Sequence, residues 1–202
     1  MPGDEPILIR NSRPEEARLL AEISIEENGT GRLRDLGPRF NALLHRHFID
    51  SRFGLSMVVE VGGEVAGNGT GLTDTRLFHR DFILHKGVPA GLLALPHLLR
   101  WRNLRTALQG LTYFPTAPEG DPAAELVAMN VRTRFHRRGL ATKMFFALMA
   151  EYRKMGIGAV KLGHIPESNK RAIAYWESLG SRYVRTETLF GSDPTRVYVY
   201  DL

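Results

Sequence analysis

Residues 136–142 carry the residue types and the spacing that bind phosphate. They read His136-Arg137-Arg138-Gly139-Leu140-Ala141-Thr142, a basic turn with one glycine that leads into a segment with helical spacing. The first N–H groups of a helix have no intrahelical acceptor, and the helix dipole adds partial positive charge at the same place. The segment therefore predicts a phosphate site built from main-chain N–H groups, in which Gly139 allows close approach of the ligand.

A buried strand and a helix are predicted to hold this turn. The apolar run Glu125–Val131 favours a strand, and the helix is expected to run from Leu140 to about Met155. Farther along, the pattern predicts a strand at Ala159–Ile165, a helix that Ser168 or Asn169 caps and that ends at Leu179-Gly180, and strands near Arg182–Phe190 and Arg196–Asp201.

The N-terminal half carries its own helix and strand signals. They predict a strand at Pro6–Asn11, a helix that Ser12 caps and that runs to about Glu27, a helix from Pro38 to about Asp50, and strands at Ser56–Val61 and Glu64–Gly71 joined by a hairpin turn at Gly62-Gly63. Strands and helices alternate in the second half, so the expected fold class is α/β or α+β with a mixed sheet. The length suits one domain over residues 1–202.

An insertion interrupts this order at about residues 73–121. Within it, Pro89–Gly110 is expected to be helical, and Pro96 can divide the helix. A leucine stripe opposes several arginines there, a pattern that a helix on a membrane surface also shows. We expect the stripe to pack on its own domain, as most such stripes do.

Composition limits the chemistry. The chain has no cysteine, which excludes disulfides, cysteine-ligated zinc and a thiol nucleophile. The N-terminus has no signal-peptide pattern and no run is long enough to span a membrane, so a cytoplasmic location is expected. His45 and His47 cannot share a helix face as metal ligands, and His79, Asp81 and His85 are better explained as surface residues, so no metal is expected.

The net charge of +5 is compatible with nucleic acid, with an anionic cofactor, or with neither. Four arginines, Arg132, Arg134, Arg137 and Arg138, lie within seven residues. A nucleic-acid groove needs interleaved aromatic residues, and only Phe135 is present. A phosphate turn is the better interpretation, and no nucleic-acid partner is expected.

Two segments resemble the motifs of the GNAT superfamily of acyl-CoA-dependent N-acyltransferases. Residues Val131–Ala141 resemble its motif V-x-P-x-x-[QR]-x-x-G-x-[GA], and residues Asn169–Gly180 resemble its N-x-x-A-x-x-x-Y-x-x-x-G helix. The two motifs have the correct order and are separated by one strand. The element order also agrees, apart from the insertion.

The resemblance implies a mostly antiparallel sheet that splays open beside the strand ending at Val131. Pantetheine would lie in the gap against the backbone of Met129, Asn130 and Val131, and Asn169 would hydrogen-bond this arm. The pyrophosphate would bind the N–H groups of Arg137 through Thr142. The co-substrate implied is acetyl-CoA or another acyl-CoA.

The chain departs from the family pattern at two positions. His136 stands where the family has Gln or Arg, and histidine can still donate to phosphate. Trp176 stands where many relatives have a tyrosine that protonates the leaving thiolate. Since Asn169 and Trp176 lie roughly 20° apart on the helix, Trp176 is expected to face the cofactor, and Tyr175 is expected to pack in the core. We expect Trp176 to pack on pantetheine or to donate to the departing sulfur.

Glu125 is the expected general base, because several relatives place a glutamate on this strand. Strand alternation puts Glu125 on one face with Val127, Met129 and Val131, unless a bulge intervenes. Desolvation would raise its pKa toward the operating pH. The alternative is a solvated carboxylate at the start of the strand. A backbone N–H near Met129 or Asn130 would meet the developing oxyanion.

The function implied is transfer of an acetyl or other short acyl group to a primary amine, by direct attack in a ternary complex. A small-molecule amine is the favoured acceptor, and aminoglycosides, amino sugars, polyamines, amino acids and protein amines all stay open. A homodimer also stays open. The alternative is a GNAT-like module that binds acyl-CoA without catalysis, because the tyrosine is missing.

Overall fold

A central mixed sheet organises the molecule. The computed structural model describes residues 5–27, 36–98, 120–188 and 194–202. Its strands are β1 (Ile7–Asn11), β2 (Gly54–Val61), β3 (Glu64–Leu72), β4 (Glu125–Val131), β5 (Ala159–Pro166), β6 (Arg182–Glu187) and β7 (Thr195–Asp201). Its α-helices are α1 (Ala17–Glu27), α2 (Gly37–Asp50), α3 (Thr75–Leu98), α5 (Leu140–Lys154) and α6 (Lys170–Ser178).

The strand order among the described residues is β1-β2-β3-β4-β5-β7-β6. All neighbours pair antiparallel except β4 and β5, which are parallel. The β4–β5 register covers only Glu125↔Lys161 and Leu126↔Leu162, so the two strands part after these two residues. The predicted fold class is confirmed, including the splay in the middle of the sheet.

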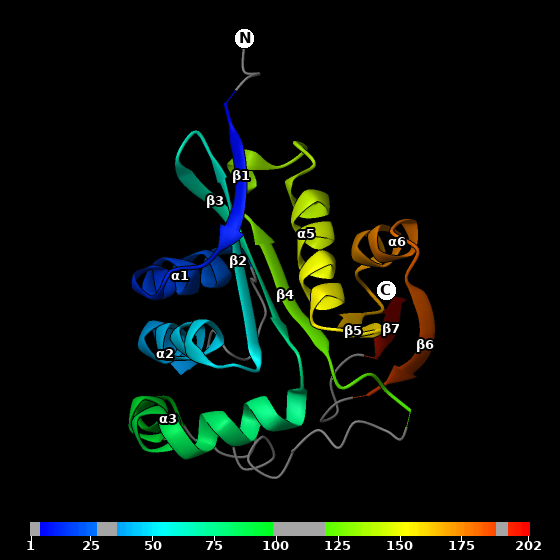
Figure 1. Cartoon of the computed structure of the whole chain (residues 1–202). Coiled ribbons are helices and arrows are strands. Elements are labelled where there is room, and N and C mark those ends of the chain that lie inside the picture. The colour runs from blue at the N-terminus through cyan, green and yellow to red at the C-terminus, as the bar shows by residue number, and fades with distance from the viewer. Residues whose placement is uncertain (1–4, 28–35, 99–119, 189–193) are drawn as a thin grey trace.

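Helices cover both faces of the sheet (Figure 1). Helices α1 and α2 pack on one face, and α5 packs on the other. The main core lies under α5, where Met144, Phe145 and Leu148 are fully buried against apolar side chains of β2, β4 and β5. Helix α5 is therefore anchored by its buried face, and its first residue lies at the end of the predicted phosphate turn.

The first helix begins differently from the prediction. A 3-10 turn at Pro14–Glu16 precedes α1, and the N-cap residue is Arg13. Ser12 does not cap it, because the Ser12 Oγ lies 2.8 Å from Ser56 Oγ on β2. Instead the Glu16 carboxylate accepts from the Arg13 N–H at 2.6 Å. A serine hydroxyl bonded to the neighbouring strand cannot also cap the helix.

The insertion contains a helix that begins well before the predicted Pro89. Helix α3 starts at Thr75, where the Asp74 side chain accepts from the Leu77 N–H at 2.8 Å. The helix continues past Pro89 and past Pro96, so neither proline marks its start or divides it. Residues 99–110 of the predicted helix lie outside the described residues.

Buried His45 on α2 is expected to make stability depend on pH. It is 6% exposed, its Nε2 lies 3.0 Å from Ser24 Oγ, and burial lowers its pKa from 6.5 to about 4. In the unfolded chain His45 binds a proton below pH 6.5, whereas in the folded chain it does so only near pH 4. The contribution of neutral His45 to the free energy of unfolding is therefore fully present above pH 6.5 and is lost as the pH falls. The contribution is expected to be about 2 kcal/mol smaller at pH 5 than at pH 7.5.

Denaturant unfolding of wild type and His45→Gln at both pH values measures this difference. The gap in unfolding free energy between the two proteins should narrow by that amount at pH 5. His85→Gln is the control, since the His85 side chain is 66% exposed. An equal gap at both pH values for His45→Gln would contradict the assignment.

Candidate active site

The turn before α5 has the backbone shape of an anion site. Arg137 and Gly139 both have positive φ, at 62° and 70°, and Gly139 is the N-cap of α5 without a side-chain cap. The first intrahelical bond runs from the Lys143 N–H to the Gly139 carbonyl. The N–H groups of Leu140, Ala141 and Thr142 therefore have no acceptor within the helix and point out of its N-terminus. Left-handed residues in such a turn gather N–H groups around one concave spot.

The open edge of β4 lies beside this turn. Arg132 donates its N–H to the Ala66 carbonyl, which makes Asn68–Asn130 the next hydrogen-bonded pair in the register with β3. The N–H and C=O groups of Met129 and Val131 therefore point the other way, toward the side from which β5 has departed. This edge can accept an extended ligand as an added strand does.

A cavity of about 380 Å³ fills the gap between β4, β5 and α6. Its lining is mostly apolar and consists of Glu125, Leu126, Val127, Ala128, Met129, Leu162, Gly163, Ile165, Pro166, Asn169, Ala172 and Trp176. Among the described side chains of this lining, Glu125 is the one that ionises. The cavity therefore combines an apolar lining, the unpaired edge of β4 and the Glu125 carboxylate.

Glu125 does not share a face with Met129 and Val131, contrary to the expected alternation. The register with β3 shifts between Thr70 and Gly71, which leaves Val127 as an extra residue on β4. Met129 and Val131 pack on the core under α5, whereas the Glu125 side chain meets Lys161 and Thr75. A bulge changes the parity of the strand, and here it turns the carboxylate to the other face.

The buried Tyr152 of α5 holds this bulge. Its hydroxyl donates to the Glu125 carbonyl at 2.9 Å and bonds the backbone of Leu72 on β3. A Cβ on Gly71 would lie 2.0 Å from this hydroxyl, so only glycine leaves room for it. Burial raises the pKa of Tyr152, which therefore stays neutral. The phenol thus takes the place of a strand-to-strand bond.

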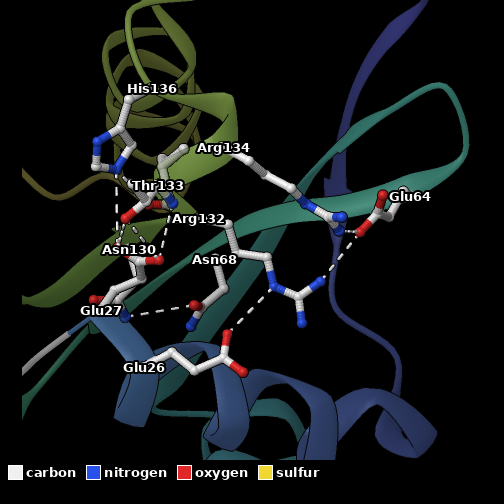
Figure 2. Close-up of polar contacts among 10 residues, drawn as sticks. Glu26, Glu27, Glu64, Asn68, Asn130, Arg132, Thr133, Arg134 and His136 are labelled. Atoms are coloured by element: carbon white, nitrogen blue, oxygen red, sulfur yellow. Dashed lines mark hydrogen bonds and ion pairs between the residues drawn. The ribbon is translucent and has the colours of Figure 1, made fainter.

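The His136 ring is turned toward the Glu27 carboxylate (Figure 2). Its Nε2 lies 2.7 Å from the Val131 carbonyl, to which the ring N–H donates, and 3.9 Å from the Glu27 carboxylate. Glu27, at the end of α1, also accepts from the Thr133 N–H at 2.9 Å. The predicted donation from His136 to phosphate would require the ring to leave the Val131 carbonyl.

Asn130 is not directed into the gap, which corrects its expected role beside Met129 and Val131. Its backbone pairs with Asn68 on β3, and its side-chain amide donates to Ser24 Oγ at 3.1 Å on the α1 side of the sheet. Strand alternation explains this, because neighbours of Asn130 on β4 face the opposite edge. The Met129 N–H, in contrast, points toward the gap between β4 and β5.

The arginine cluster is divided by ion pairs. Arg132 and Arg134 both reach Glu64, the first residue of β3 (Figure 2). Arg138 pairs with Glu5 at 3.1 Å. Among the described residues no carboxylate is paired with Arg137, which is exposed next to Gly139. Much of the positive charge that a nucleic acid would need is thus neutralised, and Arg137 stays beside the turn.

Helix α6 brings Asn169 and Trp176 to the cavity wall. Asn169 is the N-cap of α6, and its side chain accepts from the Ala172 N–H at 3.0 Å. Of the two predicted caps, Ser168 and Asn169, the structure therefore has Asn169. Trp176 faces the cavity and packs near Phe145, with 5.7 Å between ring centroids. Tyr175 is only half-buried, and its hydroxyl lies 3.4 Å from Thr142 Oγ1 on the first turn of α5. The prediction that Tyr175 packs in the core is therefore only partly correct.

Comparison with known proteins decides the family. A family model described as the acetyltransferase (GNAT) family matches residues 20–180. The chain belongs to this family. Acetyltransferases of the GNAT family use acetyl-CoA. A comparison with curated protein sequences gave no match.

Solved structures agree with the GNAT fold at low sequence identity. Ard1 from Thermoplasma volcanium is 16% identical with a TM-score of 0.61, and 97% of each chain is covered. NAA60 of Arabidopsis thaliana, solved in complex with acetyl-CoA, is 14% identical with a TM-score of 0.60, covering 98% of this chain and 99% of that one. The ribosomal-protein-S18-alanine N-acetyltransferase of Escherichia coli is 13% identical with a TM-score of 0.61, covering 97% and 94%.

The residues of this GNAT chain fit acetyl-CoA as a co-substrate. The α5 N-terminus offers an anion site, the β4 edge offers amide partners, and the cavity offers an apolar wall next to Glu125. Among the described residues no group of three His, Cys, Asp or Glu could hold a metal ion. In the described part of the chain no helix is long and apolar enough to cross a membrane.

Sequence reasoning missed three residues around Glu125: Thr75, Lys161 and Gly163. Thr75 comes from the insertion, 50 positions away. Lys161 left a signal, because it lies between the buried Val160 and Leu162, and a lysine inside a buried strand usually has a carboxylate partner.

Proposed function

We propose that this protein is an N-acyltransferase that moves an acetyl or other short acyl group from acyl-CoA to a primary amine. The observation that carries the proposal is one cavity that joins the Glu125 carboxylate, the free edge of β4 and α6 residues Asn169 and Trp176. The favoured acceptor is a small-molecule amine, and the reaction proceeds by direct attack in a ternary complex. No cysteine is present to carry an acyl group.

Each residue has a defined task in this proposal. When bound, acetyl-CoA supplies a thioester carbonyl and a thiolate leaving group. Glu125 accepts the proton that the amine loses as its nitrogen bonds to the carbonyl carbon and the carbon–sulfur bond breaks. The Met129 N–H donates to the carbonyl oxygen as negative charge develops there. Met129 and Val131 align the pantetheine arm, with Asn169 beside it, and holding both reactants in one cavity supplies proximity.

The pyrophosphate is assigned to the turn and the first turn of α5. The N–H groups of Arg137 through Thr142 donate to it, and the exposed Arg137 adds a charge. His136 contributes if its ring turns away from Val131. The two left-handed residues of the turn support this assignment, because they direct consecutive N–H groups to one side.

Two measurements test the proposal. Calorimetry with coenzyme A and acetyl-CoA is expected to show binding of both. Thiol release from acetyl-CoA is then followed across amino sugars, aminoglycosides, polyamines, amino acids and a peptide with a free N-terminus. Turnover with one class supports transfer and names the acceptor. Binding without turnover on any amine would support a binding module instead, and no binding at all would refute both.

Replacing Trp176 tests its proposed contact with the leaving sulfur. Trp176→Phe keeps an aromatic ring on the cavity wall but removes the Nε1–H donor, so kcat is expected to fall about threefold to tenfold, as for one hydrogen bond. Trp176→Tyr provides a hydroxyl donor and is expected to retain the rate. Steady-state kinetics at saturating acetyl-CoA measures both. Equal rates in wild type and both variants would remove Trp176 from the mechanism.

A further inference from the structure

The Glu125 carboxylate is held by side chains from two other elements. Lys161 on β5 places its Nζ 3.0 Å from Oε2, and Thr75, the first residue of α3, donates its hydroxyl to the same oxygen at 3.2 Å. The Lys161 side chain is 5% exposed and that of Glu125 is 14% exposed. Both contacts are therefore shielded from water, where an ion pair and a hydrogen bond act strongly.

The second carboxylate oxygen, Oε1, lies beside Gly163 and has no hydrogen-bond partner among the described side chains. A Cβ on Gly163 would lie 3.0 Å from Glu125 Oε1, so the glycine gives this oxygen its space. Glu125 and Gly163 both line the cavity. One oxygen is thus held, and the other lies beside a residue of the cavity wall.

Lys161 lies in the first of the two register pairs that join β4 and β5 before the sheet opens. Glu125 and Lys161 are register partners on β4 and β5, and only the Leu126↔Leu162 pair follows before the strands part. The backbone pairing thereby keeps the Glu125 and Lys161 side chains next to each other. Thr75 is fixed as well, because its N–H donates to the Ala123 carbonyl at 2.9 Å. Its one hydroxyl proton is shared between that carbonyl, at 3.1 Å, and Glu125 Oε2.

We infer that Lys161 and Thr75 are positioning residues that hold Glu125 by Oε2 and leave Oε1, beside Gly163, for the acceptor amine. The inference rests on the proposed function, in which Glu125 is the general base. The ammonium favours the ionised carboxylate, and a hydrogen bond to the charged form favours it too. Loss of either partner allows protonation at higher pH.

Apart from Lys161, the described groups that contact Glu125 carry no charge. Tyr152 of α5 bonds the Glu125 main-chain carbonyl and is neutral. Gly163 of β5 and Thr75 of α3 do not titrate. Within the described residues, Lys161 is the cation paired with Glu125. A change in the pH dependence after its replacement is therefore assigned to this pair.

The test is the pH–rate profile of kcat/KM for one amine, with circular dichroism to establish native folding of each variant. Lys161→Met is expected to move the acid limb about one pH unit upward, which lowers the rate about tenfold on that limb. Lys161→Arg keeps the charge and is expected to leave the limb near its wild-type position. Using the same amine throughout keeps the titration of the acceptor common to all profiles.

A second pair of variants changes Thr75 and leaves the buried Lys161 charge in place. Thr75→Val loses only the hydroxyl and is expected to move the limb upward by about half a unit, and Thr75→Ser is expected to restore it. If Lys161→Met does not fold, the threonine pair decides alone. Folded Lys161→Met and Thr75→Val with the wild-type acid limb would overturn the inference.

Glu125→Gln separates this failure from failure of the proposed function. If the acid limb of Glu125→Gln is unchanged, Glu125 is not the base and the proposed function loses its mechanism. If Glu125→Gln loses the limb while folded Lys161 and Thr75 variants keep it at the wild-type pH, the base role stands and only the positioning role is wrong.

Discussion

Replacement of Glu125 with glutamine is expected to lower kcat about a hundredfold, the lower range for loss of a general base. Glutamine has the same shape and can still accept a hydrogen bond from Thr75, but it cannot take a proton. The affinity for coenzyme A is expected to stay unchanged, because the proposed coenzyme contacts come from the β4 backbone, α5 and α6. Steady-state kinetics and calorimetry measure the two effects separately.

The matched control is Glu151→Gln on α5. Glu151 is also ion-paired, with Lys154 at 2.6 Å, but it does not line the cavity. Its replacement is expected to leave kcat unchanged. Since Glu125→Gln leaves Lys161 buried beside a neutral group, its stability is measured as well. A natively folded Glu125→Gln protein with the wild-type rate would exclude Glu125 as the base.

Replacement of Gly139 with alanine is expected to weaken coenzyme A binding at least about tenfold. The residue has φ of 70°, and a Cβ there meets nothing within 4 Å. We expect the added methyl group to occupy part of the open space beside the turn in which the pyrophosphate is proposed to bind. Loss of one hydrogen bond to a charged ligand costs about 1.5–3 kcal/mol, which corresponds to at least a tenfold change in Kd. Calorimetry measures the change.

Gly156→Ala separates binding from backbone strain. Gly156 follows the C-terminal end of α5, has φ of 74° and likewise has no atom within 4 Å of a built Cβ. Both variants are expected to lose about 1 kcal/mol of stability, because an alanine is strained in this conformation. Only Gly139→Ala is expected to lose affinity. Equal Kd values for the two variants would place the pyrophosphate elsewhere.

Much of the fold could be predicted because local signals and burial agree. The hairpin glycines, the Asn169 cap and the apolar run of β4 each specify an element on their own, and the structure has those elements near the predicted bounds. The start of α3 was missed because Pro89 resembles a first-turn proline. The Asp74 cap and the apolar Phe78 and Phe82, four residues apart, are the signals that could have placed it.

The site was predictable only where one segment defines it. The turn at Gly139 and the cavity-facing position of Trp176 follow from spacing within a single motif. The surroundings of Glu125 do not, because a bulge depends on pairing with β3 and on the Tyr152 hydroxyl that replaces a ladder bond. Thr75 and Lys161 reach the carboxylate through tertiary contacts. Spacing along the chain cannot indicate which side chains meet across a sheet.

The gap between β4 and β5 has a consequence for handling the protein without its ligand. The backbone groups of Met129 and Val131 that point into the gap have no strand partner among the described residues, and such edges promote strand pairing between chains and aggregation. The His136 ring covers one of them, the Val131 carbonyl. A ligand that lies along the edge both removes this hazard and, at a hundred times its Kd, stabilises the folded state by about 2.7 kcal/mol. Purification and storage with coenzyme A should therefore keep concentrated samples monodisperse longer than storage without it.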